Sequence, residues 1–218
     1  MKCKTQQVDY SLYLVTDSGL SLGRSTGDIV ASALKGGVSC VQLREKELGT
    51  RDFIDEARLL NRQLSLTGIP LIINDRVDVA LAVGAAGVHL GQSDMDIEDA
   101  RRLLGKTSII GISAECLEDA ILAEKRGADY IGISPVFATA TKKDTAPPLG
   151  LSGIQEIRQR VSLPLVAIGG INRENCFEVI RSGADGIAVV SAIVSAPSPE
   201  YAASQLIKAV VEARGTKQ

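Results

Sequence analysis

Eight short apolar runs recur along this chain, and each run ends in a cluster of polar or small residues. In order, these endings read VTD, VQLREK, IIND, HLGQSD, GISA, GISPVF, AIGG and AVVSA. Near-continuous hydrophobicity over four or five residues is typical of parallel strands that are buried on both faces. The pattern therefore predicts strands over residues 12–16, 40–44, 71–74, 87–90, 109–113, 130–134, 165–168 and 186–190.

Segments with the helical spacing of apolar residues alternate with these strands. They cover residues 50–68, 76–87, 96–106, 116–130, 171–186 and 199–214. A doubly wound sheet shows the same alternation, but eight units with polar residues at every strand end favour an α/β fold of the (β/α)8 TIM barrel type. Because no linker or low-complexity tract interrupts the alternation, we expect residues 1–218 to form a single barrel domain.

The composition indicates a protein with no strong overall electrostatic field. The 218 residues include 24 basic and 26 acidic side chains, for a formal net charge of -2. We therefore expect neither nucleic acid nor a membrane as a partner. The polar N-terminal segment and the lack of a long apolar run predict a soluble, cytoplasmic protein. Four widely spaced cysteines without a C-x-x-C pair are typical of free thiols. The oligomeric state stays open, with a homo-oligomer as one option.

The second strand ends in a row of polar side chains. In VQLREK, the period of two places Gln42, Arg44 and Lys46 on one face, while Val41 and Leu43 lie on the other. We interpret the polar face as a functional row that lines the barrel mouth. The alternative is a basic loop end whose charges are solvated.

Two carboxylates follow the next two strands. Asp75 comes directly after the third strand, and Asp94 lies just beyond the fourth. Neighbouring strand ends could bring both to one Mg²⁺ ion, with waters and phosphate oxygens completing the octahedron. Helix capping or a turn role is an equally good interpretation. His89 is the only histidine and lies within a strand, which favours a structural or supporting role over general-base catalysis.

Further candidates lie after the last three strands. Residues 137–148, FATATKKDTAPP, could form a mobile loop that closes over a phosphorylated ligand, with charge from Lys142 or Lys143 and hydroxyls from two threonines. The alternative is an ordinary exposed loop. Gly169-Gly170 and Val190-Ser191 follow the seventh and eighth strands, where barrels often bind phosphate through glycine amides and a helix N-terminus.

Taken in order, the motifs QLREK, IINDR, GVHLGQSDM, GISA, TATKKDT, LGLSGI, AIGGI and VVSAI resemble those of the thiamine phosphate synthase family. The match runs from Tyr13 to Ile193. The resemblance implies a barrel transferase that joins 4-amino-2-methyl-5-(hydroxymethyl)pyrimidine diphosphate to a phosphorylated hydroxyethyl-thiazole. Diphosphate is released, and Mg²⁺ is bound.

The resemblance also implies roles for individual positions. The pyrimidine diphosphate would be held by Gln42, Leu43, Arg44, Glu45, Lys46, Asn74, Ser113 and Lys142, and the thiazole phosphate by Thr139, Ala140, Thr141, Gly170, Val190 and Ser191. Asp75 and Asp94 would ligate Mg²⁺. Arg44, Lys46 and Lys142 would act catalytically, by stabilising charge on the departing diphosphate.

Two other functions stay open at this point. One is a thiazole tautomerase-like paralogue, which binds the thiazole phosphate without coupling. The other is a non-catalytic phosphate-binding barrel. Both could dispense with the diphosphate and metal residues, all of which are present in this sequence.

Overall fold

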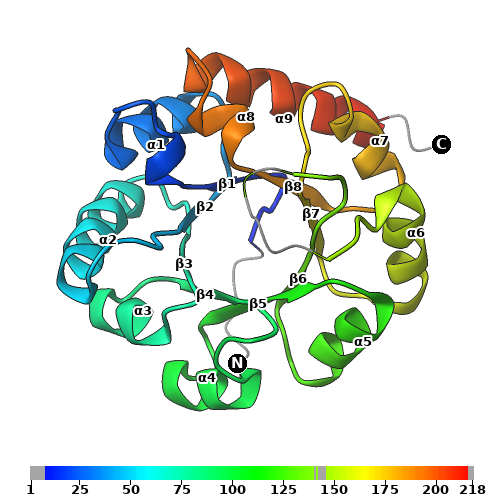
Figure 1. Cartoon of the computed structure of the whole chain (residues 1–218), viewed down its shortest axis with the longest axis horizontal. Helices are drawn as coiled ribbons and strands as arrows, with labels where there is room; N and C mark the ends of the chain where they lie inside the picture. Colours follow the sequence, from blue (N-terminus) through cyan, green and yellow to red (C-terminus); the bar gives the residue numbers. More distant parts are fainter. Residues whose placement is uncertain (1–7, 140, 142–145, 216–218) are drawn as a thin grey trace, which may run out of the picture.

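The computed structural model describes residues 8–139, 141 and 146–215. Eight parallel strands form a closed barrel in chain order, and β8 pairs with β1 to complete the ring (Figure 1). The strands are β1 (Leu12–Val15), β2 (Cys40–Leu43), β3 (Leu71–Asn74), β4 (Gly87–Leu90), β5 (Ile109–Ala114), β6 (Tyr130–Ile133), β7 (Leu165–Ile168) and β8 (Gly186–Val189). The (β/α)8 barrel is confirmed, and every predicted strand agrees with the structure to within one residue.

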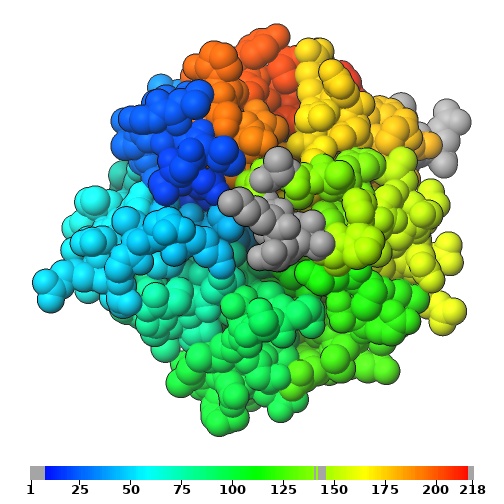
Figure 2. All heavy atoms as spheres, in the orientation of Figure 1, coloured from blue at the N-terminus to red at the C-terminus, as the bar shows by residue number. Residues whose placement is uncertain are grey.

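Helices surround the barrel on the outside, and Figure 2 shows them packed side by side as a shell. They are η1 (Ser18–Leu20), α1 (Thr26–Lys35), α2 (Thr50–Ser65), α3 (Val77–Val83), α4 (Ile97–Leu104), α5 (Leu117–Lys125), α6 (Gly150–Arg160), α7 (Cys176–Arg181), α8 (Ser191–Val194) and α9 (Pro199–Gly215). Local signals set several boundaries. Ser25 caps α1 by accepting a hydrogen bond from the Asp28 amide, and α3 is followed by its C-cap Gly84, with φ 63°.

Two apolar layers hold the barrel together. The larger lies between the strands and the helices and contains Val41 and Leu43, both fully buried. The smaller fills the barrel interior and includes Tyr13, Ile72 and Tyr130. The period of two therefore separates side chains that pack under the helices from side chains that face the axis.

The strand register decides which polar residues become neighbours. Asn74 of β3 pairs with His89 of β4, and Ser113 of β5 pairs with Gly132 of β6. These positions lie at the carboxyl ends of the strands, where the barrel interior opens.

The structure bears in part on two expectations from the sequence, the lack of a membrane span and the free cysteines. None of the described helices is long and apolar enough to cross a membrane. The cysteines of the described segments, Cys40, Cys116 and Cys176, are free thiols.

Candidate active site

A cavity of about 1080 Å³ lies at the carboxyl ends of the strands. Residues from all eight strands or the loops that follow them contribute to its walls. The predicted site residues that line it are Gln42, Arg44, Lys46, Asn74, Asp75, Asp94, Ser113, Thr139, Thr141, Gly170, Val190 and Ser191. Ala140 and Lys142 lie outside the described residues. One cavity therefore collects positions that are spread over 150 residues of sequence.

The polar row of β2 points into the cavity as its period predicts. Arg44 donates from Nη1 to Asp17 Oδ2 at 2.9 Å, and Lys46 Nζ lies 2.5 Å from Asp75 Oδ2. Each cation is thus held by one carboxylate while it lines the cavity. Such pairing limits the motion of long side chains and directs their charge.

Two members of the predicted β2 segment face elsewhere. Leu43 packs in the apolar layer under the helices. Glu45 is 8% exposed, and its Oε2 accepts a hydrogen bond from Ser18 Oγ at 2.9 Å. Neither residue is among those that line the cavity, so either could contact a substrate there only through its main chain.

Asp75 and Asp94 lie together at the cavity wall, and their carboxyl groups hydrogen-bond to each other. Burial raises the pKa of Asp94, and Asp75 raises it further. Burial also acts to raise the pKa of Asp75, but hydrogen bonds from Lys46 and Asp94 outweigh it, so that this pKa falls below its usual value. Two adjacent carboxyls are suited to a hard divalent cation, whose charge would offset their mutual repulsion.

The alternative capping role does not apply to either carboxylate. The residue that caps α3 is Arg76, and the residue that caps α4 is Asp96. Asp94 does make a turn contact, because its Oδ2 accepts from the Gly91 amide at 2.6 Å. Within the described residues no cluster of three or more His, Cys, Asp or Glu side chains is placed to hold a metal. A cation here would therefore take most of its ligands from water and substrate oxygens.

The opposite wall is built from small residues. Gly170 has φ 63°, and a Cβ at this position would lie 2.6 Å from the carbonyl oxygen of Ala138. Glycine is thus required both by the backbone conformation and by the close approach of the segment after β6. Val190 and Ser191 lie where β8 passes into the short helix α8, which sequence reasoning did not predict. Backbone amides and hydroxyls at this wall are suited to bind phosphate oxygens.

The cavity floor joins Gln42, His89 and Ser113, which sequence reasoning singled out, to two tyrosines that it missed. A chain of hydrogen bonds runs from Gln42 through Tyr13, Tyr130 and His89 to Ser113, with distances of 3.0, 3.0, 2.8 and 2.9 Å in that order. We call these five residues the floor network. The supporting role expected for His89 fits this position. The two tyrosines gave no signal, since an aromatic residue within a buried strand is usually interpreted as a core residue.

Known proteins resemble this chain over nearly its whole length. The family model described as thiamine monophosphate synthase matches residues 12–193. The thiamine-phosphate synthase of Albidiferax ferrireducens is 56% identical over 202 residues, which cover 91% of this chain and 92% of that protein. The thiamine-phosphate synthase of Chloroflexus aurantiacus is 55% identical over 199 residues, with the same coverage of each chain.

Solved structures agree with the sequence comparisons. The thiamine phosphate pyrophosphorylase from Pyrococcus furiosus superposes with a TM-score of 0.88 at 40% identity and covers 95% of this chain and 98% of its own. A 3-hexulose-6-phosphate synthase superposes with a TM-score of 0.67 at 15% identity, over 91% of this chain and 99% of its own, which shows a shared fold alone.

Proposed function

The chain belongs to the thiamine monophosphate synthase family and is a transferase, and from this premise we propose how its cavity performs the coupling. The substrates are 4-amino-2-methyl-5-(hydroxymethyl)pyrimidine diphosphate and the phosphate of 4-methyl-5-(2-hydroxyethyl)thiazole. The bond between the pyrimidine methylene and the diphosphate oxygen breaks, and its electron pair leaves with diphosphate. The thiazole nitrogen then uses its lone pair to form the new carbon–nitrogen bond. The products are thiamine phosphate and diphosphate.

This reaction requires no protein nucleophile, since the aminopyrimidine ring stabilises the methylene cation. The protein's task is to orient two phosphorylated rings and to neutralise the leaving group. Arg44 and Lys46 line the cavity with their charges fixed by Asp17 and Asp75. Preorganised cations of this kind stabilise charge that develops in the transition state. The observation that carries the proposal is this pair of anchored cations beside two carboxylates in one cavity.

We propose that Asp75 and Asp94 hold Mg²⁺ together with oxygens of the diphosphate. Their adjacent carboxyl groups fit such an ion. When bound, the ion would supply positive charge to the leaving diphosphate. The thiazole phosphate would be held by Thr139, Thr141, Gly170, Val190 and Ser191, which line the cavity. Ala140 and Lys142 are proposed for these substrates from the family resemblance, as are the main chains of Leu43 and Glu45.

The test is a coupling assay on the purified protein with both substrates, in Mg²⁺ or in excess EDTA. Thiamine phosphate and diphosphate should appear in equal amounts with Mg²⁺, and neither should appear with EDTA. Binding of the thiazole phosphate without coupling would instead support a tautomerase-like or non-catalytic barrel. The intact diphosphate and metal residues favour the first outcome.

Three further properties are proposed with the function. Residues 1–218 act as one barrel domain, and the protein works in the cytoplasm. A homo-oligomer stays a prediction, which sedimentation equilibrium of the purified chain would test.

A further inference from the structure

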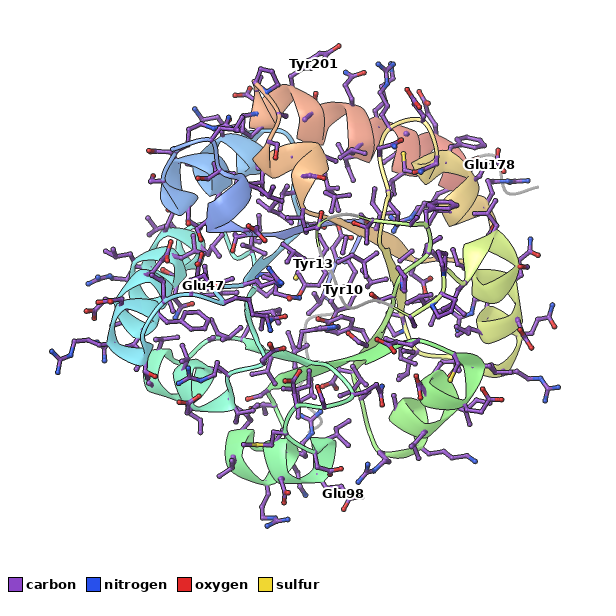
Figure 3. The ribbon with its side chains drawn as sticks, viewed as in Figure 1. Tyr10, Tyr13, Glu47, Glu98, Glu178 and Tyr201 are labelled. Carbon is purple, nitrogen blue, oxygen red and sulfur yellow. The ribbon has the colours of Figure 1, made fainter. Side chains whose placement is uncertain are left out.

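The floor network carries an inference about which pyrimidine ring the cavity accepts, and it rests on the function proposed above. Its central members are withdrawn from solvent: Tyr13 is 1% exposed and Tyr130 is fully buried. Gln42 is 5% exposed and joins Tyr13 at one end, while Ser113 joins His89 at the other. All five residues line the cavity, and Figure 3 labels Tyr13 near the centre of the barrel. The network therefore connects two ligand-facing groups through the barrel interior.

Each hydroxyl in the network has a single proton to donate, so when both phenols donate within the network all the hydrogen bonds run in one direction. Gln42 donates from Nε2 to the Tyr13 hydroxyl at 3.0 Å. In the direction that Gln42 sets, Tyr13 donates to Tyr130, and Tyr130 donates to His89 Nδ1. Burial raises the pKa of both tyrosines well above the ordinary value, which keeps both hydroxyls protonated.

The direction of the network determines the chemistry of its two ends. Since Nδ1 of His89 accepts, its ring carries the proton on Nε2 and donates to Ser113 Oγ at 2.9 Å. The Ser113 hydroxyl hydrogen is then left to donate toward the cavity. At the other end, the Nε2 of Gln42 is engaged with Tyr13, which leaves its Oε1 as an acceptor.

We propose that the floor network makes Tyr13, Tyr130 and His89 positioning residues that select a 4-aminopyrimidine over a 4-oxopyrimidine. A 4-aminopyrimidine offers an amino donor and ring-nitrogen acceptors, which complement the Gln42 oxygen and the Ser113 hydroxyl. A 4-oxo ring reverses this pattern, because it carries a carbonyl acceptor and a ring N–H donor. Two mismatched contacts should weaken binding by on the order of 10² to 10³.

The glycines of β5 and β6 support the view that this interior is built for the network. A Cβ at Gly111 would lie 2.1 Å from Cζ of Tyr130, and a Cβ at Gly132 would lie 2.8 Å from Cε1 of His89. The two rings occupy the space that side chains at these positions would otherwise fill. Tyr10 packs against the same ring, with centroids 4.6 Å apart, but its hydroxyl is outside the network.

The first experiment reads the tautomer directly. His89 is the only histidine of the sequence, so ¹⁵N-labelled histidine in the untagged protein gives a single ring spectrum. At pH 8 we expect Nε2 protonated and Nδ1 unprotonated. Tyr130→Phe removes the donor to Nδ1 and should give a mixture of the two tautomers. Rotation of the Gln42 amide would reverse every bond of the network, so a ring protonated on Nδ1 in the parent protein would overturn the proposal.

The second experiment measures selectivity with the 4-amino and 4-oxo pyrimidine monophosphates, which lack the diphosphate leaving group, in calorimetric titrations without the thiazole substrate. The parent protein should bind the amino ring on the order of 10² to 10³ times more tightly, and Tyr130→Phe should reduce this ratio to within about tenfold. Tyr10→Phe is the matched control and should keep the parental ratio. Equal binding of both rings by the parent protein would refute the selection, whatever its tautomer.

These outcomes are separate from the fate of the proposed function. If coupling fails while the tautomer and the selectivity are as expected, the synthase reaction is refuted and the floor network stands. If coupling succeeds while His89 is protonated on Nδ1, the synthase reaction stands and the proposal for the floor network is refuted.

Discussion

Replacement of Arg44 separates the electrostatic contribution of this residue to catalysis from its contribution to folding. Arg44→Ala removes one anchored cation from the cavity wall and leaves the Asp17 carboxylate without its guanidinium partner. Removal of one preorganised donor typically costs on the order of 10² to 10³ in rate, or about 2.7 to 4 kcal/mol of transition-state stabilisation. We expect kcat to fall by that factor.

The effect on stability should be smaller. The Arg44 and Asp17 side chains are 22% and 18% exposed, so the pair is neither fully buried nor fully solvated. Exposed ion pairs contribute up to about 1 kcal/mol, and a stranded, half-buried carboxylate adds to the loss. We expect the free energy of unfolding to fall by about 1 to 2 kcal/mol, which lowers Tm by roughly 2 to 8 °C in a chain of this size.

Steady-state coupling at saturating Mg²⁺ and thermal unfolding of the same preparations measure the two effects. The double variant Asp17→Asn/Arg44→Ala removes the stranded charge, so it should regain stability without regaining turnover. Arg58→Ala, on the outer face of α2 where its partner is Asp55, should leave both quantities close to parental. A kcat for Arg44→Ala within fivefold of the parent would refute the role of this residue.

Three further changes test other parts of the site. Mg²⁺ at a hundred times its Kd should stabilise the parent protein by about 2.7 kcal/mol and so raise its Tm. Asp94→Asn should abolish this rise. Burial, and then Asp75, raise the pKa of Asp94, so the contribution of Asp94 to the free energy of unfolding is present at low pH and is lost as pH rises through that pKa. In urea titrations without Mg²⁺, the parent protein should show this loss and Asp94→Asn should not. Gly111→Ala places a Cβ 2.1 Å from Tyr130 and should cost about 1 to 3 kcal/mol in urea unfolding, whereas an unchanged midpoint would show that the ring can move. Gly170→Ala should raise KM for the thiazole phosphate about tenfold, with a smaller change in KM for the diphosphate substrate. The reason is that φ 63° strains alanine by about 1 to 2 kcal/mol. Equal changes in the two KM values would contradict a wall specific for the thiazole phosphate.

The sequence by itself was sufficient for the architecture and for much of the cavity wall. Each run was nearly continuously apolar over four or five residues, and that pattern has few solutions other than a strand covered on both faces. The same period of two placed Gln42, Arg44 and Lys46 on one face, and the cavity lining agrees. Strand ends were less exact, as in β5, which continues to Ala114. Strand ends depend on pairing with neighbours, and a single segment does not encode that pairing.

Only the tertiary structure decided which of these residues interact. Asp75 and Asp94 are equally good as cap residues on spacing alone, and strand register together with the Gly91 turn brings their carboxyl groups together. Tyr13 and Tyr130 read as core residues, yet closure of the barrel joins their hydroxyls, 117 positions apart, in one hydrogen bond. Local periodicity follows from the backbone geometry of each segment. Contacts across the barrel depend on closure of the whole sheet, which no segment contains.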